Sequence, residues 1–144
     1  MRGAWPLEGN RRRQLPDGIQ QMPAFLSRHS FLLQKMNIRR AVQADLPKLL
    51  EIYNYEVING VATFGTEPLT LAQRQPWFDA HNVANHPLIV AEINGVPAGY
   101  ATLSSFNSKA AYDSTVELSI YVDQACRGKH IGRELMSAIL DLAR

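Results

Sequence analysis

The chain has 144 residues, a net charge of +2 and an apolar fraction of 46%, which suits one domain with a buried core. Its single cysteine, Cys126, excludes an intramolecular disulfide and fits a reducing compartment, so we expect a cytoplasmic protein. No apolar run approaches membrane-spanning length, and the slightly acidic segment after residue 35 argues against a nucleic-acid partner.

The first 35 residues differ in composition from the rest. They carry six basic against two acidic residues, three prolines and no hydrophobic periodicity, which predicts a disordered basic extension. Scarce serine and the lack of an amphipathic pattern disfavour a transit peptide. An extension upstream of a functional start at Met36 is the simpler interpretation. We therefore expect one folded domain over residues 36–144.

A strand and a helix are predicted at the start of this domain. Residues 37–42 are typical of a short strand. Asp45 is placed to cap a helix that runs through Tyr55, with Pro47 in its first turn. The side chains at helical spacing predict a buried stripe made of Leu46, Leu49, Leu50, Tyr53 and Val57.

A second helix and a hairpin follow. Thr70, with a glutamine three residues later, forms a capping box. Pro76 lacks a backbone donor and is expected to kink or shorten the helix. Residues 88–92 and 98–106 are predicted strands, joined by a turn that contains Asn-Gly, a dipeptide typical of tight hairpins.

The last predicted strand and helix carry the strongest patterns. After a connection over residues 107–113, apolar and polar residues alternate from residue 115 to 122, as in a strand with one buried face. The helix that follows has apolar residues three and four apart, namely Ile131, Leu135, Ile139 and Leu142. The order of elements predicts a mixed α/β (α+β) fold with a largely antiparallel sheet flanked by helices.

The loop between this strand and this helix is a candidate anion site. Its sequence, RGKHIG over residues 127–132, places two glycines at a helix start, where unpartnered backbone N–H groups and the helix dipole attract phosphate. It is not a Walker loop, because His130 stands where a hydroxyl residue would bind magnesium. Taken alone, the glycines could equally serve packing.

The same run resembles the R/Q-x-x-G-x-G/A loop of the GNAT family of N-acetyltransferases, which grips the pyrophosphate of acetyl-CoA. Further segments are similar to the subfamily of phosphinothricin and methionine sulfoximine acetyltransferases: IRRAVQADLPKLLEIYN, VATFGTEPLT, RQPWFDAH, VAEINGVPAGYA, AYDSTVELSIYV and CRGKHIG. The resemblance covers residues 36–144. It implies the GNAT fold, acetyl-CoA as co-substrate and acetylation of the amine of a small amino-acid-like substrate, and it is compatible with a homodimer.

The resemblance also implies roles for individual residues. Glu117 matches the general base, acting through water. Backbone groups of Ile120, Tyr121 and Val122 would hydrogen-bond the pantetheine arm. The pyrophosphate would lie against Arg127, Gly128, Lys129, His130, Ile131, Gly132 and Arg133, and the substrate pocket would include Phe64, Arg74, Lys109 and Tyr112.

Each of these roles has a structural alternative in the sequence. Glu117 could be an acidic residue on a solvated strand face. Arg74 could be a surface residue of a solvated helix, and Phe64 could plug the edge of the core. His81 and His86 lack the spacing of zinc ligands, so we expect surface histidines and no metal. Cys126 is expected to be a linker residue rather than an acetyl acceptor.

The chain departs from the family pattern in two respects. His130 replaces the first motif glycine, and a Cβ there restricts φ. Family members continue through another strand, a helix and two more strands, which are not present in residues 36–144. The competing hypothesis is therefore a truncated, catalytically incompetent fragment or interaction module, with the strand at residues 115–122 left as an unpaired edge.

Overall fold

The computed structural model describes residues 35–83 and 85–144. The extension predicted over residues 1–35 lies outside the described residues, apart from Lys35. The described elements are β1 (Met36–Arg40), α2 (Leu46–Asn59), α3 (Leu71–Asp79), β2 (Leu88–Ile93), β3 (Val96–Ser105), β4 (Val116–Val122) and α4 (Ile131–Leu142), with short 3-10 turns at Gln43–Asp45, Ala110–Tyr112 and Gln124–Cys126.

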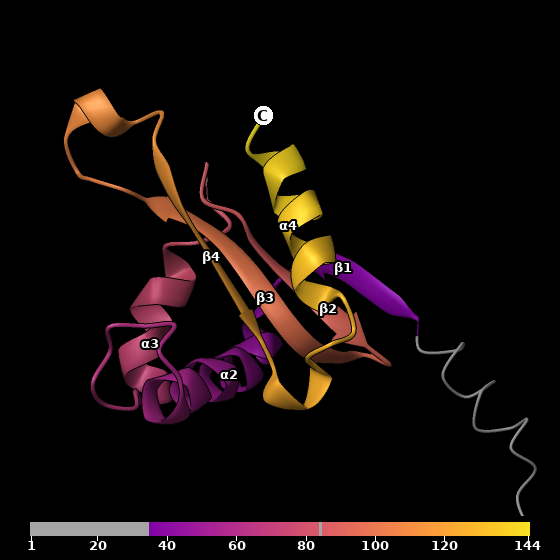
Figure 1. Ribbon diagram of the computed structural model, residues 1–144. Coiled ribbons are helices and arrows are strands. Elements are labelled where there is room, and N and C mark those ends of the chain that lie inside the picture. Colours follow the sequence, from indigo (N-terminus) through magenta and orange to yellow (C-terminus); the bar gives the residue numbers. More distant parts are fainter. Residues whose placement is uncertain (1–34, 84) are drawn as a thin grey trace, which may run out of the picture. The chain divides into compact units, whose positions relative to one another are not determined.

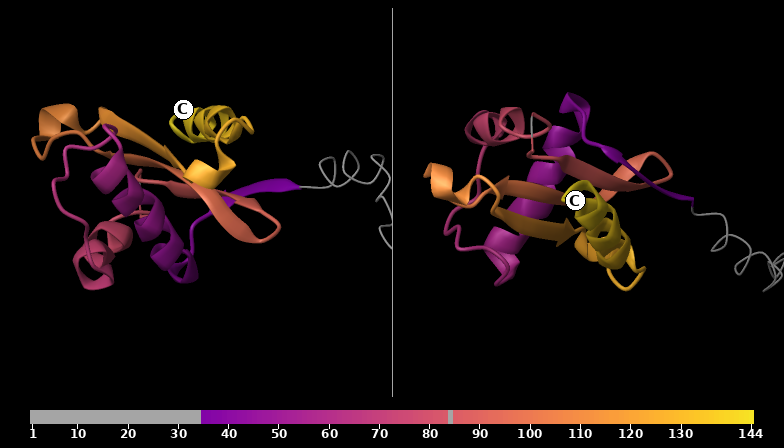
Figure 2. Two further views of the ribbon diagram at one scale, coloured as in Figure 1. Left: turned by 60° about the horizontal axis from the view of Figure 1, so that its bottom comes forward. Right: turned by 90° about the horizontal axis from the view of Figure 1, so that it is seen from above.

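The four strands form one antiparallel sheet in the order β1-β2-β3-β4. Helix α4 covers one face of the sheet, and α2 and α3 cover the other (Figures 1 and 2). The predicted mixed α/β fold with an antiparallel sheet is confirmed. Strand β4 lies at the edge of the sheet as the structure describes it.

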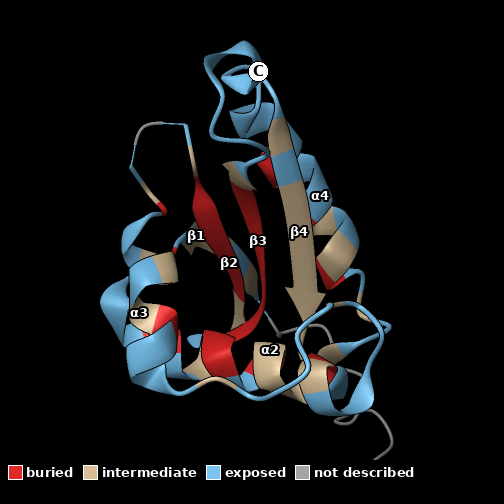
Figure 3. Ribbon diagram, turned by 90° about the vertical axis from the view of Figure 1, so that its left-hand side faces the viewer, coloured by how far each residue is buried: buried red, intermediate tan, exposed pale blue. Residues whose placement is uncertain are grey.

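Both faces of the central strands are buried, as Figure 3 shows for β2 and β3. Side chains that alternate along a strand point to opposite faces, so Ile89 and Ala91 pack towards α4 while Leu88 and Val90 pack towards α2 and α3. Helix α4 contributes Ile131, Leu135 and Ile139 to the first cluster. Leu142, predicted as the next member of that stripe, is 48% exposed.

The hairpin between β2 and β3 forms at the predicted Asn-Gly turn. Asn94 and Gly95 have φ of 53° and 80°, the left-handed pair that a two-residue hairpin turn requires. The pairing then skips one residue, since Ala91 lies opposite Gly99 and Glu92 lies opposite Pro97. This bulge turns two successive residues, Ala98 and Gly99, towards α4.

Helix α2 is longer than its pattern predicted. It continues past Tyr55 to Asn59 and buries Ile52 and Glu56 in addition to the leucines of the predicted stripe. Helix α3 begins with the predicted capping box, in which Thr70 accepts a hydrogen bond from Gln73 N–H. Helix α3 is nine residues long and continues through Pro76 to Asp79, so it does not end at the proline.

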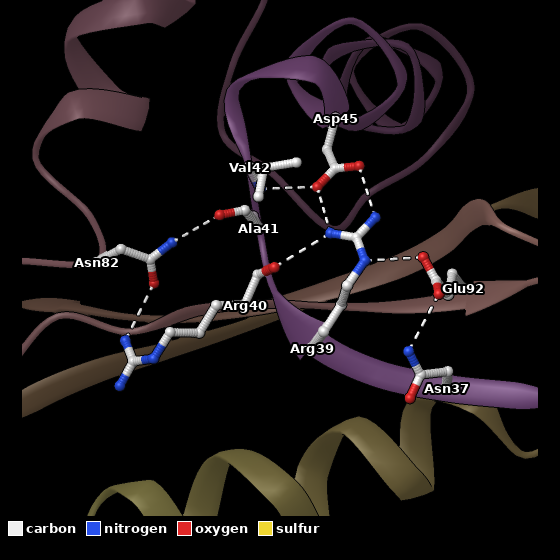
Figure 4. A network of polar contacts seen from close by, with 8 residues as sticks. All are labelled: Asn37, Arg39, Arg40, Ala41, Val42, Asp45, Asn82 and Glu92. Carbon is white, nitrogen blue, oxygen red and sulfur yellow. Dashed lines mark hydrogen bonds and ion pairs between the residues drawn. The ribbon is translucent and has the colours of Figure 1, made fainter.

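Arg39 joins β1 to the start of α2 and to β2 (Figure 4). Its guanidinium donates to both carboxylate oxygens of Asp45, at 2.7 and 3.0 Å, and to Glu92 at 2.8 Å. Asp45 also accepts a bond from Val42 N–H. Asp45 therefore stands at the predicted N-cap position of α2 without capping that helix: its carboxylate is occupied by Arg39 and by the preceding 3-10 turn.

Replacing Asp45 with Asn is expected to destabilise the fold by about 2 kcal/mol at pH 7, because it removes charge-assisted bonds from a buried acceptor. Burial raises the pKa of Asp45, but hydrogen bonds from Arg39 and Val42 N–H bring it below its ordinary value of 3.8. A lowered folded-state pKa stabilises the fold above pH 3.8, and that contribution is lost as pH falls through the lower folded value.

Urea unfolding of both proteins between pH 7 and pH 2.5 measures this contribution. The difference in unfolding free energy between wild type and Asp45→Asn should shrink as the pH falls below about 4. A difference that stays constant over the range would show that the Asp45 charge does not stabilise the fold.

Candidate functional site

A cavity of about 220 Å³ lies between the sheet and the α2–α3 face, and we call it the Glu117 cavity. Alternating residues of two neighbouring strands form its floor, because Ser104 on β3 lies opposite Glu117 on β4 and Thr102 lies opposite Ser119. The complete lining is Tyr53, Thr63, Arg74, Trp77, Tyr100, Thr102, Ser104, Glu117, Ser119 and Tyr121.

Arg74 supplies a buried positive charge to this cavity. Only 9% of it is exposed, and its guanidinium carbon lies 4.2 Å from the ring centre of Tyr53 and 3.6 Å from that of Trp77. The alternative that Arg74 is a solvated surface residue is therefore wrong. Its Nε has no hydrogen-bond partner among the described residues, and neither has the buried hydroxyl of Tyr100.

Aromatic rings hold these two polar groups in place. Tyr100 stacks on Tyr121, its neighbour across the strands, with ring centres 5.2 Å apart, and Trp77 meets Tyr100 edge-on at 5.9 Å. Burial raises the pKa of Tyr100, and the nearby Arg74 charge opposes that rise. Buried polar groups without partners are rare in folded proteins, so the cavity has unused capacity to donate hydrogen bonds to an anion.

His81 is buried, so the prediction that it is a surface histidine is wrong. It follows α3, with Nδ1 2.6 Å from the carbonyl oxygen of Trp77 and Nε2 3.0 Å from Ser104 Oγ. Burial lowers the pKa of His81, and the charges of His86 and Arg74 lower it further. His86, by contrast, is half-buried.

The other predicted substrate residues do not line the cavity. Phe64 is fully exposed, at 105% of its reference area, so its predicted role as a plug of the core edge is wrong. Lys109 and Tyr112 lie on the connection between β3 and β4, where Lys109 is exposed and Tyr112 packs against Phe106.

A second cavity, of about 280 Å³, lies where β4 leads into α4, and we call it the loop cavity. Its lining is Val122, Cys126, Arg127, Gly128, His130, Ile131 and Gly132. Gly128 and His130 have φ of 76° and 63°. His130 thus adopts the left-handed backbone that a glycine would take easily, and the expected restriction of φ does not prevent this conformation.

Backbone amides at the start of α4 point out of the helix next to this cavity. The first bond of the helix runs from Glu134 N–H to His130 O, and the amides of the preceding turn have no acceptor within the helix. Of the other predicted phosphate residues, Lys129 is half-buried and Arg133 is exposed. Unpartnered amides at the start of a helix are the feature that attracts anions in proteins generally.

Two ion pairs tie this connection to α2. Arg127 pairs with the buried carboxylate of Glu56, and Lys48 pairs with Asp123 at 2.7 Å. Sequence patterns did not indicate either pair, because the partners lie about 70 residues apart in the chain. The Arg127 guanidinium is therefore already engaged on one side, while 52% of its side chain stays exposed.

Strand β4 connects the two cavities. Glu117, Ser119 and Tyr121 line one, and Val122 lines the other. Successive residues of a strand direct their backbone groups to opposite sides. Because Asp123 N–H bonds inward to Ala98 O, the backbone groups of Val122 and Ile120 face away from β3, and those of Tyr121 face towards it.

A family model matches the part of the chain that forms most of this sheet and the helix start after β4. The model described as "Acetyltransferase (GNAT) family" matches residues 49–144. The chain belongs to the GNAT family. It is 38% identical over 109 residues to the L-amino acid N-acyltransferase MnaT of Escherichia coli and, equally, to the L-methionine sulfoximine/L-methionine sulfone acetyltransferase of Salmonella typhimurium.

These matches cover 76% of the chain and 63% and 64% of the two relatives, so the chain spans less than two thirds of their length. Among solved GNAT structures, the phosphinothricin acetyltransferase of Sinorhizobium meliloti in complex with AcCoA has a TM-score of 0.72 and 38% identity, over 75% of this chain and 59% of that one. The family and the subfamily expected from the sequence are confirmed.

Three further observations concern this GNAT domain. In the part of the chain that the structure describes, no three His, Cys, Asp or Glu side chains gather closely enough to hold a metal ion. None of the helices over residues 35–83 and 85–144 has the length and apolar character needed to cross a membrane. Cys126, a free thiol, is half-buried in the lining of the loop cavity.

Proposed function

We propose that this domain is part of an N-acetyltransferase that moves the acetyl group of acetyl-CoA to the amine of a small, amino-acid-like acid. The observation that carries the proposal is the arrangement of two cavities along β4: an anion-binding loop at one end and a carboxylate, Glu117, beside the unpaired cation of Arg74 at the other. Named activities of the relatives support the same reaction and substrate class.

The loop cavity is the proposed site of the pyrophosphate. Gly128 and His130 in the left-handed conformation curve the backbone around the cavity, so that the amides of Ile131, Gly132 and Arg133 can donate to phosphate oxygens. Lys129 and Arg127 would add positive charge. Arg127 is held by Glu56, so we assign it to shaping the loop as well as to attracting phosphate.

The pantetheine arm would follow β4 from this loop to Glu117. Five residue steps separate Glu117 from Val122, which is roughly 16 Å in a strand and matches the length of an extended pantetheine. The outward backbone groups of Ile120 and Val122 are the proposed hydrogen-bond partners. The thioester would then lie beside Glu117.

Glu117 is the proposed general base. An ammonium group cannot attack a thioester until it loses a proton, and a carboxylate within reach, directly or through one water, can accept it. The amine nitrogen then forms a bond to the acetyl carbon as the carbon–sulfur bond breaks. The products are the N-acetyl compound, coenzyme A as its thiol and one proton, which Glu117 has passed on.

Arg74 is the proposed partner for the substrate's acid group. It is a buried guanidinium with an unused donor, held rigidly between two rings, and a guanidinium suits the planar fork of a carboxylate. Phe64, Lys109 and Tyr112 remain predicted contacts, to be brought closer by movement of their exposed segments.

A thiol-release assay with the purified chain tests the proposal. Acetyl-CoA with methionine sulfoximine should release free thiol at a rate that depends on the amine, and mass spectrometry should find the N-acetyl product. Calorimetry with acetyl-CoA alone gives a separate readout of the loop cavity. If the purified chain shows no turnover and does not bind acetyl-CoA, the proposal is contradicted for this chain and the incompetent fragment is favoured.

A further inference from the structure

The hydrogen bond between His81 and Ser104 determines whether Ser104 donates or accepts hydrogen bonds in the Glu117 cavity. His81 Nδ1 lies 2.6 Å from the carbonyl oxygen of Trp77, and a carbonyl oxygen only accepts hydrogen bonds. Nδ1 must therefore carry the proton. In a neutral imidazole the other nitrogen, Nε2, is then an acceptor.

Burial keeps His81 in this neutral form. Only 7% of the residue is exposed, and the Trp77 ring lies over it with ring centres 4.7 Å apart. The positive charge of Arg74 nearby also disfavours an imidazolium. The tautomer is thus fixed by a backbone carbonyl and the charge state by the surroundings.

The fixed tautomer orients the hydroxyl of Ser104. Nε2 lies 3.0 Å from Ser104 Oγ, and since Nε2 can only accept, the serine must donate its one proton to it. The lone pairs of Ser104 Oγ are left for the cavity, which Ser104 lines opposite Glu117. A serine that could otherwise donate or accept has become an acceptor only.

We propose that Ser104 Oγ accepts a hydrogen bond from the amine of the acceptor substrate, and that His81 is the positioning residue that commits the hydroxyl to this role. The inference rests on the proposed function and deepens it. Glu117 and Ser104 face each other across β3 and β4, so an amine between them has two acceptors for its N–H groups, which leaves its lone pair free for the thioester once one proton is lost.

The arrangement also selects between substrates. Arg74 offers only donors and recognises the acid group, while Glu117 and Ser104 offer only acceptors and recognise the amine. A molecule with both groups fits, one in which a methylene replaces the amine loses the contact with Ser104, and one in which a hydroxyl replaces it can donate to only one of the two acceptors. Ser104 is thus a specificity-determining residue for primary amines.

Binding of two ligands to the full chain separates this role from a structural one. The probes are methionine sulfone and 4-(methylsulfonyl)butanoate, which lacks the amine, each titrated calorimetrically with coenzyme A present. Ser104→Ala should weaken methionine sulfone binding by about tenfold, as for loss of a bond to a charged group, and change binding of the other acid by less than about twofold. Ser105→Ala, on the neighbouring exposed serine, should change neither.

Two substitutions at His81 test the positioning. His81→Phe keeps a ring against Trp77 but removes the acceptor, and should reduce the preference for the amine. His81→Gln places an amide oxygen, which is an acceptor, near the position of Nε2. This variant should keep the preference for the amine that His81→Phe loses. The inference would be overturned if Ser104→Ala weakened binding of both ligands equally, or if the preference for methionine sulfone over 4-(methylsulfonyl)butanoate survived that substitution. It would also be overturned if the wild type did not prefer methionine sulfone.

Nitrogen-15 NMR of the ligand-free chain gives a readout that needs no activity. The His81 signal, identified by its absence in His81→Gln, should show a protonated Nδ1 and an unprotonated Nε2. Protonation at Nε2 would overturn the inference even in an active enzyme. Conversely, amine-selective binding without thiol release would count against the proposed transfer and leave the role of Ser104 supported.

Discussion

Glu117→Gln is expected to lower the turnover number for acetyl transfer by about 100- to 1000-fold, the range for loss of a positioned general base. The substitution keeps the shape of the side chain, and Glu117 lies some five residues along β4 from the loop cavity. Binding of acetyl-CoA should therefore change by less than about twofold. Steady-state kinetics and calorimetry on the same preparation measure the two quantities.

A matched control distinguishes chemistry from charge. Glu67→Gln removes one negative charge from an exposed position on the connection between α2 and α3 and should leave turnover unchanged. If Glu117→Gln retained full activity, Glu117 would not be the base, and a water or another cavity group would have to take the proton.

Arg74→Met is expected to have the second largest effect, with opposite signs for binding and stability. The KM for methionine sulfone should rise by about 100-fold, because the acid group loses its buried charged partner. The unliganded fold should become more stable by about 1 kcal/mol, since methionine fills the space between Tyr53 and Trp77 without burying a charge. Kinetics and urea unfolding measure the two changes.

The compound 3-(methylsulfonyl)propan-1-amine, which lacks the carboxylate, is the control for this effect. Its KM should be the same for Arg74→Met and for wild type, because it has no group for Arg74 to bind. A parallel rise in KM for both amines would show that Arg74 supports the shape of the cavity rather than recognising an acid.

Local pattern predicted the fold well where one residue type decides the conformation. The Asn-Gly turn formed as expected, because those residues accept the left-handed backbone of a two-residue hairpin. The capping box at Thr70 formed because its partners lie within one turn of helix. The alternation over residues 115–122 predicted β4 for the same local reason.

The site was less predictable because it depends on packing between distant elements. The bare pattern of α3 left a solvated position open for Arg74, since nothing local shows that Tyr53 and Trp77 enclose it. His81 is buried where its ring meets Trp77 and its Nε2 bonds Ser104, which lies on a strand 23 positions later. One signal is visible in the sequence: Tyr100, Thr102 and Ser104 recur at strand spacing as a polar row, which lies beside Glu117 and Ser119 on the same face of the sheet.

The bulge at Ala98 in β3 sets the phase of the strand beyond it, that is, which residues face each side of the sheet. Before the bulge, the hairpin turn fixes the register of β3 on β2. Beyond the bulge, even-numbered residues from Tyr100 to Ser104 face the Glu117 cavity, and Ala101 and Leu103 face α4. If β3 continued without this bulge, Ala98 rather than Gly99 would lie opposite Ala91, and the phase beyond it would shift by one residue. Leu103 would then project into the cavity and Ser104 into the apolar core, so one bulge next to the hairpin turn decides which side of the sheet can bind a polar molecule.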